Sequence, residues 1–436
     1  MLSLRQLPRL RDQLCRLVTS RAKKPFRPID RHHRSLSTYS SKVLEQYRKY
    51  AEYSPSPVSL SHFLHFGVKE PESRSYDFLH REIPVRLANM MQEIELLPDE
   101  LLRQQSCRLI QDFYMLSFGE MIEYENAPQS SDTFAQFAET LDRIRNRHSD
   151  TVEMMAEAVM SVTHQSQNGV TEIDAKTQYF LDRLYMSRIS IRMLINQHLM
   201  LYGGQLPKEE SDIGCISPHC NVAHIVQRAY QNASFLCDQT YMRSPEMTLD
   251  ITNTCDPAID VVEFVYVPAH LYHILFELFK NALRATIEHL GEDVDEYPAI
   301  RVLVVKSEQD ISIRISDQGG GVPRQISENL FHYMYSTAPR PDMGSGGGGQ
   351  APMAGLGYGL PLSRLYARYF RGDIALTSLH GVGTDVVVYL RALAEDAAEV
   401  LPVFNNFTKK SYLNSESNGS DWTDPIPGFY TRNGRH

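Results

Sequence analysis

The strongest constraint on the fold is a change of sequence pattern at a break between Gly203 and Pro218, which is rich in Gly, Pro, Ser and acidic residues. Before this break the chain has helical periodicity and few strand signals, most clearly in Val85–Leu97 and Tyr179–Leu201. Residues 101–124 and 134–161 also favour helix. One face of the Tyr179–Leu201 helix carries a recurring set at 3.6-residue spacing, namely Leu181, Leu184, Tyr185, Arg188, Ile191, Arg192 and Ile195. Four long antiparallel helices would bury such faces as a bundle.

Beyond the break, strand-like and helical segments alternate. The predicted helices are Asn221–Tyr241, Ala269–Leu290 and Leu362–Phe370, and the predicted strands are Val261–Val267, Ile300–Val305, Ile311–Ser316, Ile374–Leu379 and Asp385–Leu390. This order predicts an α+β sandwich and not a doubly wound sheet. We therefore expect a leader at residues 1–42, a helical bundle at 43–207, an α/β domain at 208–395 and a polar tail at 396–436.

The first 42 residues are rich in arginine and leucine and contain only two acidic residues, Asp12 and Asp30. An Arg-rich, acid-poor, amphipathic segment is typical of a mitochondrial transit peptide. A disordered basic tail, or an arm that binds an acidic partner, is the alternative interpretation.

Composition excludes several other classes. A net charge of -9 argues against non-specific nucleic-acid binding, and no apolar run is long enough to cross a bilayer. Six scattered cysteines indicate a reducing compartment and no disulfide framework. Cys215, His219 and Cys220 lack a second ligand pair at finger spacing, so we interpret them as part of a linker loop and not as a metal site.

The predicted helix Ala269–Leu290 carries candidate chemistry. His273, Glu277 and Asn281 lie four residues apart and therefore project from one face. An asparagine can offer magnesium a neutral oxygen while a glutamate takes a proton. Taken alone, such a pair is more often a solvated helix face.

Three glycine-containing motifs follow. Asp317, at the end of a predicted strand, begins a segment with Gly319 and Gly321, where a carboxylate could accept a hydrogen bond from an adenine amino group. The segment Gly355–Gly359 precedes a predicted helix and could cradle phosphates, although a lone glycine motif is usually a flexible loop. Thr384 opens the last predicted strand and could close an adenine pocket.

These four motifs, in this order, resemble the ATP site of the GHKL superfamily. The residues around them, in segments 273–286, 316–323, 335–341, 355–373 and 381–390, resemble the mitochondrial pyruvate dehydrogenase kinases, as do segments 82–98 and 180–198 of the first half. The resemblance extends from about Leu60 to Trp422. It departs from the family pattern at Gln318, where arginine is frequent, and in the glycine run 344–349.

The resemblance implies roles for individual residues. Glu277 would be the general base, with His273 tuning it, and Asn281 would hold Mg²⁺. The implied ATP-binding residues are Glu277, Leu278, Phe279, Lys280, Asn281, Ala282, Leu283, Arg284, Asp317, Gly319, Gly321, Ser336, Thr337, Gly355, Leu356, Gly357, Tyr358, Gly359, Leu360 and Thr384. Asp421 and Trp422 would anchor the tail on the opposite subunit of a homodimer.

Arg188 and Arg192 lie on an apolar helix face, where an internal ion pair or a side chain extended to solvent is the ordinary interpretation. The resemblance favours a regulatory pocket for pyruvate or a similar carboxylate instead. The implied lining is Tyr114, Ser117, Arg147, His148, Ser187, Arg188, Ile191, Arg192 and Ile195. Arginine suits bidentate carboxylate recognition.

The resemblance thus implies a homodimeric, Mg²⁺- and ATP-dependent serine kinase of the mitochondrial matrix. Its substrate would be the α subunit of pyruvate dehydrogenase, which phosphorylation would inactivate, and its docking partner the lipoyl domain of the dihydrolipoyl acetyltransferase core. Three alternatives remain: a branched-chain ketoacid dehydrogenase kinase, a non-catalytic ATP-gated binding module, and a two-component kinase that phosphorylates His148. The surroundings of His148 lack the phosphoacceptor context of the last class.

Overall fold

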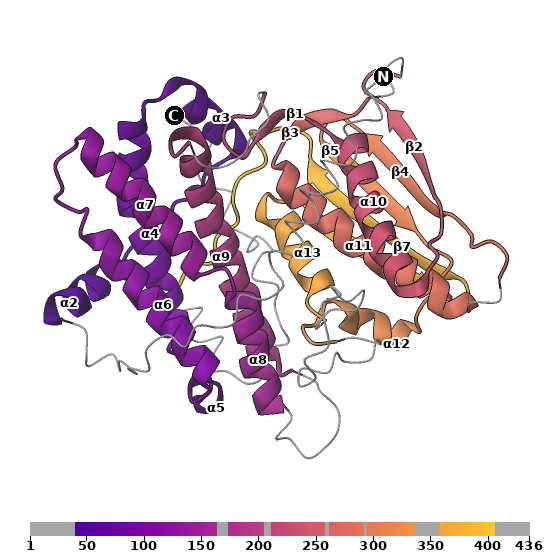
Figure 1. The fold of residues 1–436 in the computed structure, drawn as a ribbon, viewed down its shortest axis with the longest axis horizontal. Coiled ribbons are helices and arrows are strands. Elements are labelled where there is room, and N and C mark those ends of the chain that lie inside the picture. The colour runs from indigo at the N-terminus through magenta and orange to yellow at the C-terminus, as the bar shows by residue number, and fades with distance from the viewer. Residues whose placement is uncertain are drawn as a thin grey trace, which may run out of the picture.

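The computed structural model describes residues 40–163, 173–204, 211–257, 261–291, 294–335 and 357–405. A helical half and an α/β half lie side by side (Figure 1). The expected leader up to residue 39, the glycine run 344–349 and the Asp421–Trp422 pair lie outside the described residues, as do Ser336, Thr337, Gly355 and Leu356. None of the helices in the described part of the chain has the length and apolar character that crossing a bilayer requires.

The first half is a helix bundle, as predicted. Its helices are α2 (Ser41–Tyr50), α3 (Leu60–Lys69), α4 (Glu72–Ile94), α5 (Asp99–Leu102), α6 (Gln105–Ile122), α7 (Ser131–Arg147), α8 (Thr151–Thr163) and α9 (Ala175–Tyr202). Hydroxyl and carboxylate caps begin several of them: Ser59, Ser130 and Asp174 accept hydrogen bonds from backbone amides of the first turns of α3, α7 and α9. The prediction captured only the second half of α4 and merged α7 with α8, which are separated at His148–Asp150.

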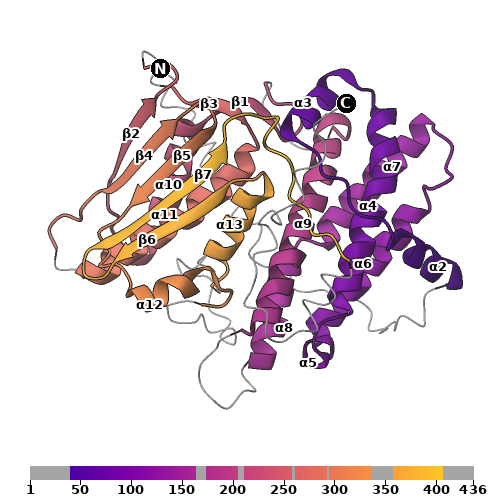
Figure 2. The ribbon, with the colours of Figure 1, turned by 180° about the vertical axis from the view of Figure 1, so that it is seen from behind.

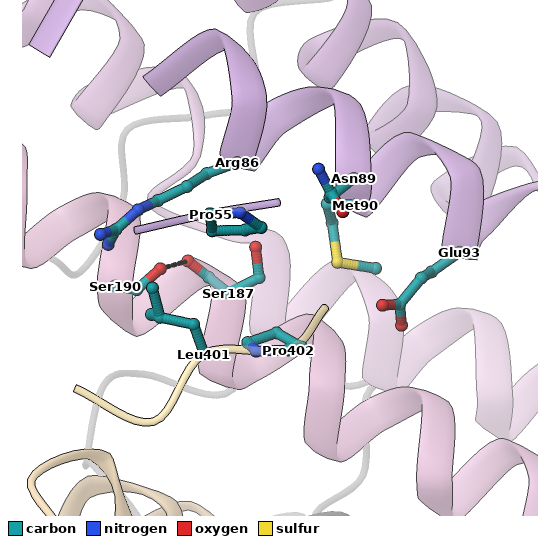
Figure 3. A pocket seen from close by; sticks show the side chains of 9 residues that line it. All are labelled: Pro55, Arg86, Asn89, Met90, Glu93, Ser187, Ser190, Leu401 and Pro402. Atoms are coloured by element: carbon teal, nitrogen blue, oxygen red, sulfur yellow. Dashed lines mark hydrogen bonds between the residues drawn. The ribbon is translucent and has the colours of Figure 1, made fainter. Parts of the chain in front are cut away.

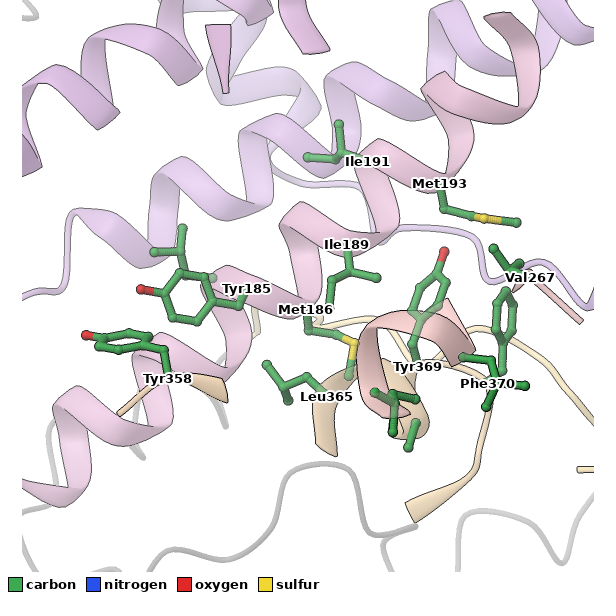
Figure 4. Packing of buried hydrophobic residues seen from close by; sticks show 14 of the residues in the cluster. Tyr185, Met186, Ile189, Ile191, Met193, Val267, Tyr358, Leu365, Tyr369 and Phe370 are labelled. Carbon is green, nitrogen blue, oxygen red and sulfur yellow. The ribbon is translucent and has the colours of Figure 1, made fainter. Parts of the chain in front are cut away.

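Helix α9 is buried on more than the one predicted face. Met186, Ile189 and Met193 lie off the predicted stripe and are each no more than 3% exposed. The reason is that α9 packs against α4 and α7 of the bundle and also against α13 (Gly359–Tyr369) of the second half. Figure 4 shows Met186 and Ile189 pointing toward Leu365 and Tyr369 of α13. A single amphipathic stripe was therefore too narrow an interpretation.

The second half is a five-stranded sheet covered on one face by helices (Figures 1 and 2). Its strands are β2 (Met247–Asn253), β4 (Ile300–Lys306), β5 (Asp310–Ser316), β6 (Asp373–Leu379) and β7 (Gly383–Arg391), in the spatial order β2-β4-β5-β7-β6. The β2–β4 pair is parallel and the others are antiparallel. Helices α10 (Val222–Tyr241), α11 (Pro268–Leu290) and α13 lie on the covered face. This confirms the predicted α+β architecture.

Alternation explains which face is covered. In β5, Ile311, Ile313 and Ile315 are buried, whereas Arg314 between them is exposed. Two strands were not predicted. One is β2, and the other is β1 (Ser217–Asn221), which pairs with β3 (Glu263–Tyr266). The short elements α12 (Arg324–Ser327) and η2 (Glu328–Phe331) follow β5 along the chain.

After β7 the chain returns to the bundle, so the beginning of the predicted tail is packed. We call residues 397–404 the return segment. Its Ala397 and Glu399 form backbone hydrogen bonds with Leu60 and Val58, and Glu399 forms an ion pair with Arg86 of α4 at 2.8 Å. Figure 3 shows Leu401 and Pro402 lying beside Ser187 and Ser190 of α9, with Arg86, Asn89 and Glu93 of α4 above them. The return segment thus joins both halves.

Candidate nucleotide-binding and catalytic site

A cavity lies between α11, the covered face of the sheet and the beginning of α13. With its open mouth it encloses about 1080 Å³, a size suited to a nucleotide. Its lining includes Glu277, Leu278, Lys280, Asn281, Ala282, Arg284, Asp317, Gly357, Gly359, Leu360 and Thr384 of the predicted set, together with Ala285, Ile315, Val322, Leu330, Tyr335, Pro361, Leu376 and Val386. Phe279 and Leu283, also predicted, belong to α11 but are buried in the core and do not line the cavity.

Helix α11 places the acid–base residues at one end of this cavity. Glu277 Oε1 lies 2.8 Å from Lys280 Nζ, and this ammonium group also lies 5.2 Å from the centre of the Phe276 ring. His273 lies one turn earlier, against the ring of Tyr366, and its Nε2 has no hydrogen-bond partner among the described residues. Burial lowers the pKa of His273, so its imidazole is neutral at neutral pH. A carboxylate held beside a cation and a neutral imidazole suits a general base.

Asp317 marks the opposite end. It follows β5 directly, and its Oδ1 accepts hydrogen bonds from the amides of Gly319 at 2.8 Å and Thr384 at 3.2 Å. Burial raises the pKa of Asp317 to about 6, against hydrogen bonds that lower it. A hydrogen-bond donor stabilises a buried carboxylate, so Asp317 is suited to bind the adenine amino group.

The glycines near Asp317 serve close packing and do not line the cavity. A Cβ on Gly319 would lie 2.6 Å from Cβ of Ala285 on α11. Gly321 has φ +57°, a region that side chains other than glycine rarely adopt, and a Cβ there would lie 2.4 Å from the carbonyl oxygen of Leu379. Both glycines therefore let the Asp317 loop approach α11 and β6.

The phosphate end is formed where α13 begins. Gly359 is the first residue of this helix, and a Cβ there would lie 2.3 Å from Oε2 of Glu277. Helix amino-termini attract phosphate through unpaired amides and the helix dipole. Tyr358, by contrast, is only 6% exposed and packs away from the cavity lining.

The donor set fits Mg-ATP. Asn281 is exposed, lines the cavity and lies one turn from Glu277, so its amide oxygen is available as a hard, neutral ligand. Lys280 and Arg284 line the same cavity and supply positive charge near the Gly357–Leu360 turn.

A second cavity lies inside the bundle. It is lined by Leu87, Tyr114, Ile144, Arg145, His148, Arg188, Ile191, Arg192 and Ile195. Ser117, Arg147 and Ser187, which the resemblance implied, are not among these residues. Arg147 instead binds Glu120 through both terminal nitrogens, at 2.7 and 3.0 Å, and also donates to Ser117 at 2.8 Å.

Arg145 takes the position in the lining that was expected of Arg147. Residues 145 and 148 lie three apart and share a helix face, whereas residue 147 faces elsewhere, and this spacing is the signal that could have identified Arg145. Ile144 and Leu87 were also missed. Ser117 stays close, because its hydroxyl lies 2.9 Å from His148 Nε2.

Three arginines line the bundle cavity, and one of them, Arg145, is paired with Asp142 at 2.5 Å. Burial, followed by Arg147, Arg188 and Arg192, lowers the pKa of His148 to about 3, so the imidazole is neutral and does not add to the charge. Arg188 donates to the backbone carbonyls of His148 at 3.3 Å and Ser149 at 2.9 Å. These carbonyl contacts do not neutralise its charge, so the cavity suits a small anion.

The fold and the nucleotide cavity define a GHKL-type ATPase domain. Residues 266–394 match the family model described as histidine kinase-, DNA gyrase B- and HSP90-like ATPase. Residues 57–217 match the model described as mitochondrial branched-chain alpha-ketoacid dehydrogenase kinase.

Whole-chain relatives narrow the assignment. The chain is 48% identical to the mitochondrial pyruvate dehydrogenase (acetyl-transferring) kinase of Drosophila melanogaster, over 86% of this chain and 91% of that one. It is 48% identical to isozyme 3 of Homo sapiens, over 88% and 94%, and 44% identical to the Ascaris suum kinase, over 92% and 98%. The chain belongs to the mitochondrial pyruvate dehydrogenase kinase family, whose members are ATP-dependent protein kinases.

A solved structure, the mycobacterial sensor histidine kinase MprB, aligns with a TM-score of 0.27 at 15% identity, over 40% of this chain and 95% of that one. A likeness at this level carries no argument.

Proposed function

We propose that this kinase transfers the γ-phosphoryl group of Mg-ATP to a serine of the α subunit of pyruvate dehydrogenase and thereby inactivates that enzyme complex. The observation that carries the proposal is the placement of Glu277, Lys280 and Asn281 at the same end of the nucleotide cavity as the beginning of α13. The names of whole-chain relatives at 44–48% identity support the substrate.

Each residue has a part in the transfer. The serine hydroxyl gives its proton to Glu277 as its oxygen forms a bond to the γ-phosphorus, and the bond from that phosphorus to the bridging oxygen of ADP breaks. Lys280, Arg284 and the backbone at Gly357–Leu360 hold the phosphates, while Asp317 and Thr384 hold adenine. Magnesium held by Asn281 would neutralise charge on the phosphates. Catalysis then rests on positioning and charge.

The finer parts of the proposal concern place and partners. The relatives' names place them in mitochondria, and we assign this chain to the matrix. We assign it a homodimer with a tail anchored by Asp421 and Trp422, and the lipoyl domain of the acetyltransferase core as docking partner. We assign the bundle cavity to pyruvate or a related carboxylate, supported by Arg188 and Arg192 in its lining.

The test is transfer of labelled phosphate from Mg-ATP to the pyruvate and branched-chain dehydrogenases, offered separately, each with and without its lipoyl domain. Glu277→Gln should lower transfer by about a hundredfold or more while nucleotide binding persists. Glu263→Gln changes a half-exposed carboxylate on β3 that does not line the cavity; it is the matched control and should behave as wild type. Label on the branched-chain enzyme alone would overturn the substrate, and bound ATP without any label would favour the ATP-gated module.

A further inference from the structure

Behind the phosphate end of the nucleotide cavity, residues next to its lining pack against the bundle. Tyr358 stands between two cavity-lining residues, Gly357 and Gly359, yet its own ring is buried. The Tyr358 ring lies 5.1 Å from the ring of Tyr333 and 6.0 Å from that of Tyr185 on α9, centre to centre. Figure 4 shows Tyr185 and Tyr358 facing one another across the boundary between the two halves. Aromatic rings at these separations attract and fix one another.

Tyr333 is itself attached to α9. Its hydroxyl donates a 2.7 Å hydrogen bond to Asp182 Oδ1, and its backbone amide donates to Gln178 Oε1 at 3.1 Å. Gln178 in turn donates to the carbonyl of Phe331 at 3.3 Å. Burial, then the Asp182 carboxylate, raises the pKa of Tyr333 well above its ordinary value, so the phenol stays the donor.

The next residue shows why this attachment matters. Met334 has φ +63°, a conformation that a non-glycine residue adopts only where its surroundings impose it. Its amide donates to the carbonyl of Gly357 at 3.2 Å, and a Cβ on Gly357 would lie 2.7 Å from the Met334 carbonyl carbon. The backbone of Gly357, which lines the phosphate end of the cavity, therefore packs directly against Met334. The contacts of Tyr333 with α9 fix the position of Met334.

We propose that Asp182 and Tyr333 are positioning residues for the nucleotide. Their hydrogen bond, which ties Tyr333 to α9 of the bundle, fixes the position of the Gly357–Gly359 backbone that contacts the phosphates. Neither residue lines the cavity, so each acts through the Met334–Gly357 contact. The inference rests on the proposed ATP site. It adds that nucleotide affinity depends on a side chain of α9, 151 residues away in sequence from its partner.

The test measures the dissociation constant of Mg-ADP on the full chain, with KM for ATP and kcat alongside. Tyr333→Phe removes only the hydroxyl, and Asp182→Leu replaces the accepting carboxylate with an apolar side chain. Each should weaken Mg-ADP binding about fivefold, which is about 1 kcal/mol, raise KM for ATP similarly and leave kcat within about twofold. Asp182→Asn keeps an acceptor oxygen and should restore affinity to within about twofold of wild type. The double variant should be no weaker than either single one.

Tyr47→Phe is the matched control, because the Tyr47 hydroxyl also donates to a carboxylate within the bundle, Glu95 at 3.0 Å, far from the cavity lining. It should lower the unfolding temperature as much as Tyr333→Phe does, without changing Mg-ADP affinity. An unchanged dissociation constant in Tyr333→Phe, or an equal change in Tyr47→Phe, would overturn the inference. Failure of the wild-type chain to bind Mg-ADP would instead refute the nucleotide site itself, and with it this inference.

Discussion

The buried cluster around Arg86 gives a prediction whose size follows from its charges. Arg86 Nε lies 2.8 Å from Glu82, its terminal nitrogens lie 2.8 and 3.0 Å from the Glu399 carboxylate, and it also donates to the Ser56 carbonyl. The side chain of Arg86 is 1% exposed and that of Glu399 is 0% exposed. One guanidinium thus stands between two carboxylates, and Tyr369 also donates to Glu399.

Arg86→Met keeps an unbranched apolar stem but removes the guanidinium, leaving two buried carboxylates without their shared cation. Removing one partner from a buried pair costs about 3–5 kcal/mol, a large part of the total of about 5–15 kcal/mol for a domain. Arg103→Met is the control, because Arg103 and its partner Asp99 are 70% and 82% exposed at 3.8 Å. It should cost less than about 1 kcal/mol.

The assay is urea unfolding followed by far-UV circular dichroism at about pH 8 and about pH 5.5. Burial raises the pKa of Glu82, and Arg86 opposes that rise. When the pKa of a carboxyl is higher in the folded than in the unfolded protein, the protein becomes less stable as the pH rises through the folded pKa. Removing Arg86 raises the folded pKa of Glu82 further. The penalty of Arg86→Met should therefore be larger at the higher pH. A loss no greater than that of Arg103→Met, or a penalty that grows on acidification, would refute this reasoning.

Three further results are expected. Asp317→Asn should weaken Mg-ADP binding yet stabilise the protein at about pH 8 by roughly 1–3 kcal/mol, because the pKa of about 6 means that folding favours the protonated acid. This gain in stability, measured by thermal unfolding, should disappear below about pH 4. Gly359→Ala places a Cβ against Glu277 and should lower kcat about tenfold or more in initial-rate assays with the circular dichroism spectrum unchanged; full activity would contradict the close approach. Arg188→Met should raise the pyruvate concentration needed for half inhibition about tenfold, whereas Arg143→Met, on the half-exposed side of α7, should not; equal effects would count against the cavity as the anion site.

Local pattern was enough to predict most elements of the α/β half. The predicted bounds of α10, α11 and β4–β7 differ from the observed ones by three residues or fewer. β2 was missed although apolar and polar residues alternate from Met247 to Thr252, which is a recognisable strand signal. β1 was missed because Ser217–Asn221 has a proline and little β-branched character, so only its pairing with β3 makes it a strand.

The candidate site was predictable where a motif places side chains on one helix face or at a strand end, as for Glu277, Asn281 and Asp317. It was not predictable where packing decides. Sequence spacing alone does not show that Tyr358 would pack against Tyr185, nor that Tyr333 would meet Asp182. These contacts depend on how the two halves dock, which is tertiary information.

The return segment has a consequence for the order in which the chain acquires its structure. Arg86 and Glu399 are 313 residues apart, yet both belong to the interior of the first half. Domains generally fold from the amino-terminus as the chain emerges, and loop closure over such a distance comes late. The bundle must therefore wait for the whole α/β half to be made before its buried cation meets its second carboxylate. A chain truncated before Glu399 should therefore have a less stable first half. The stability of the bundle thus indicates whether the α/β half has been made in full.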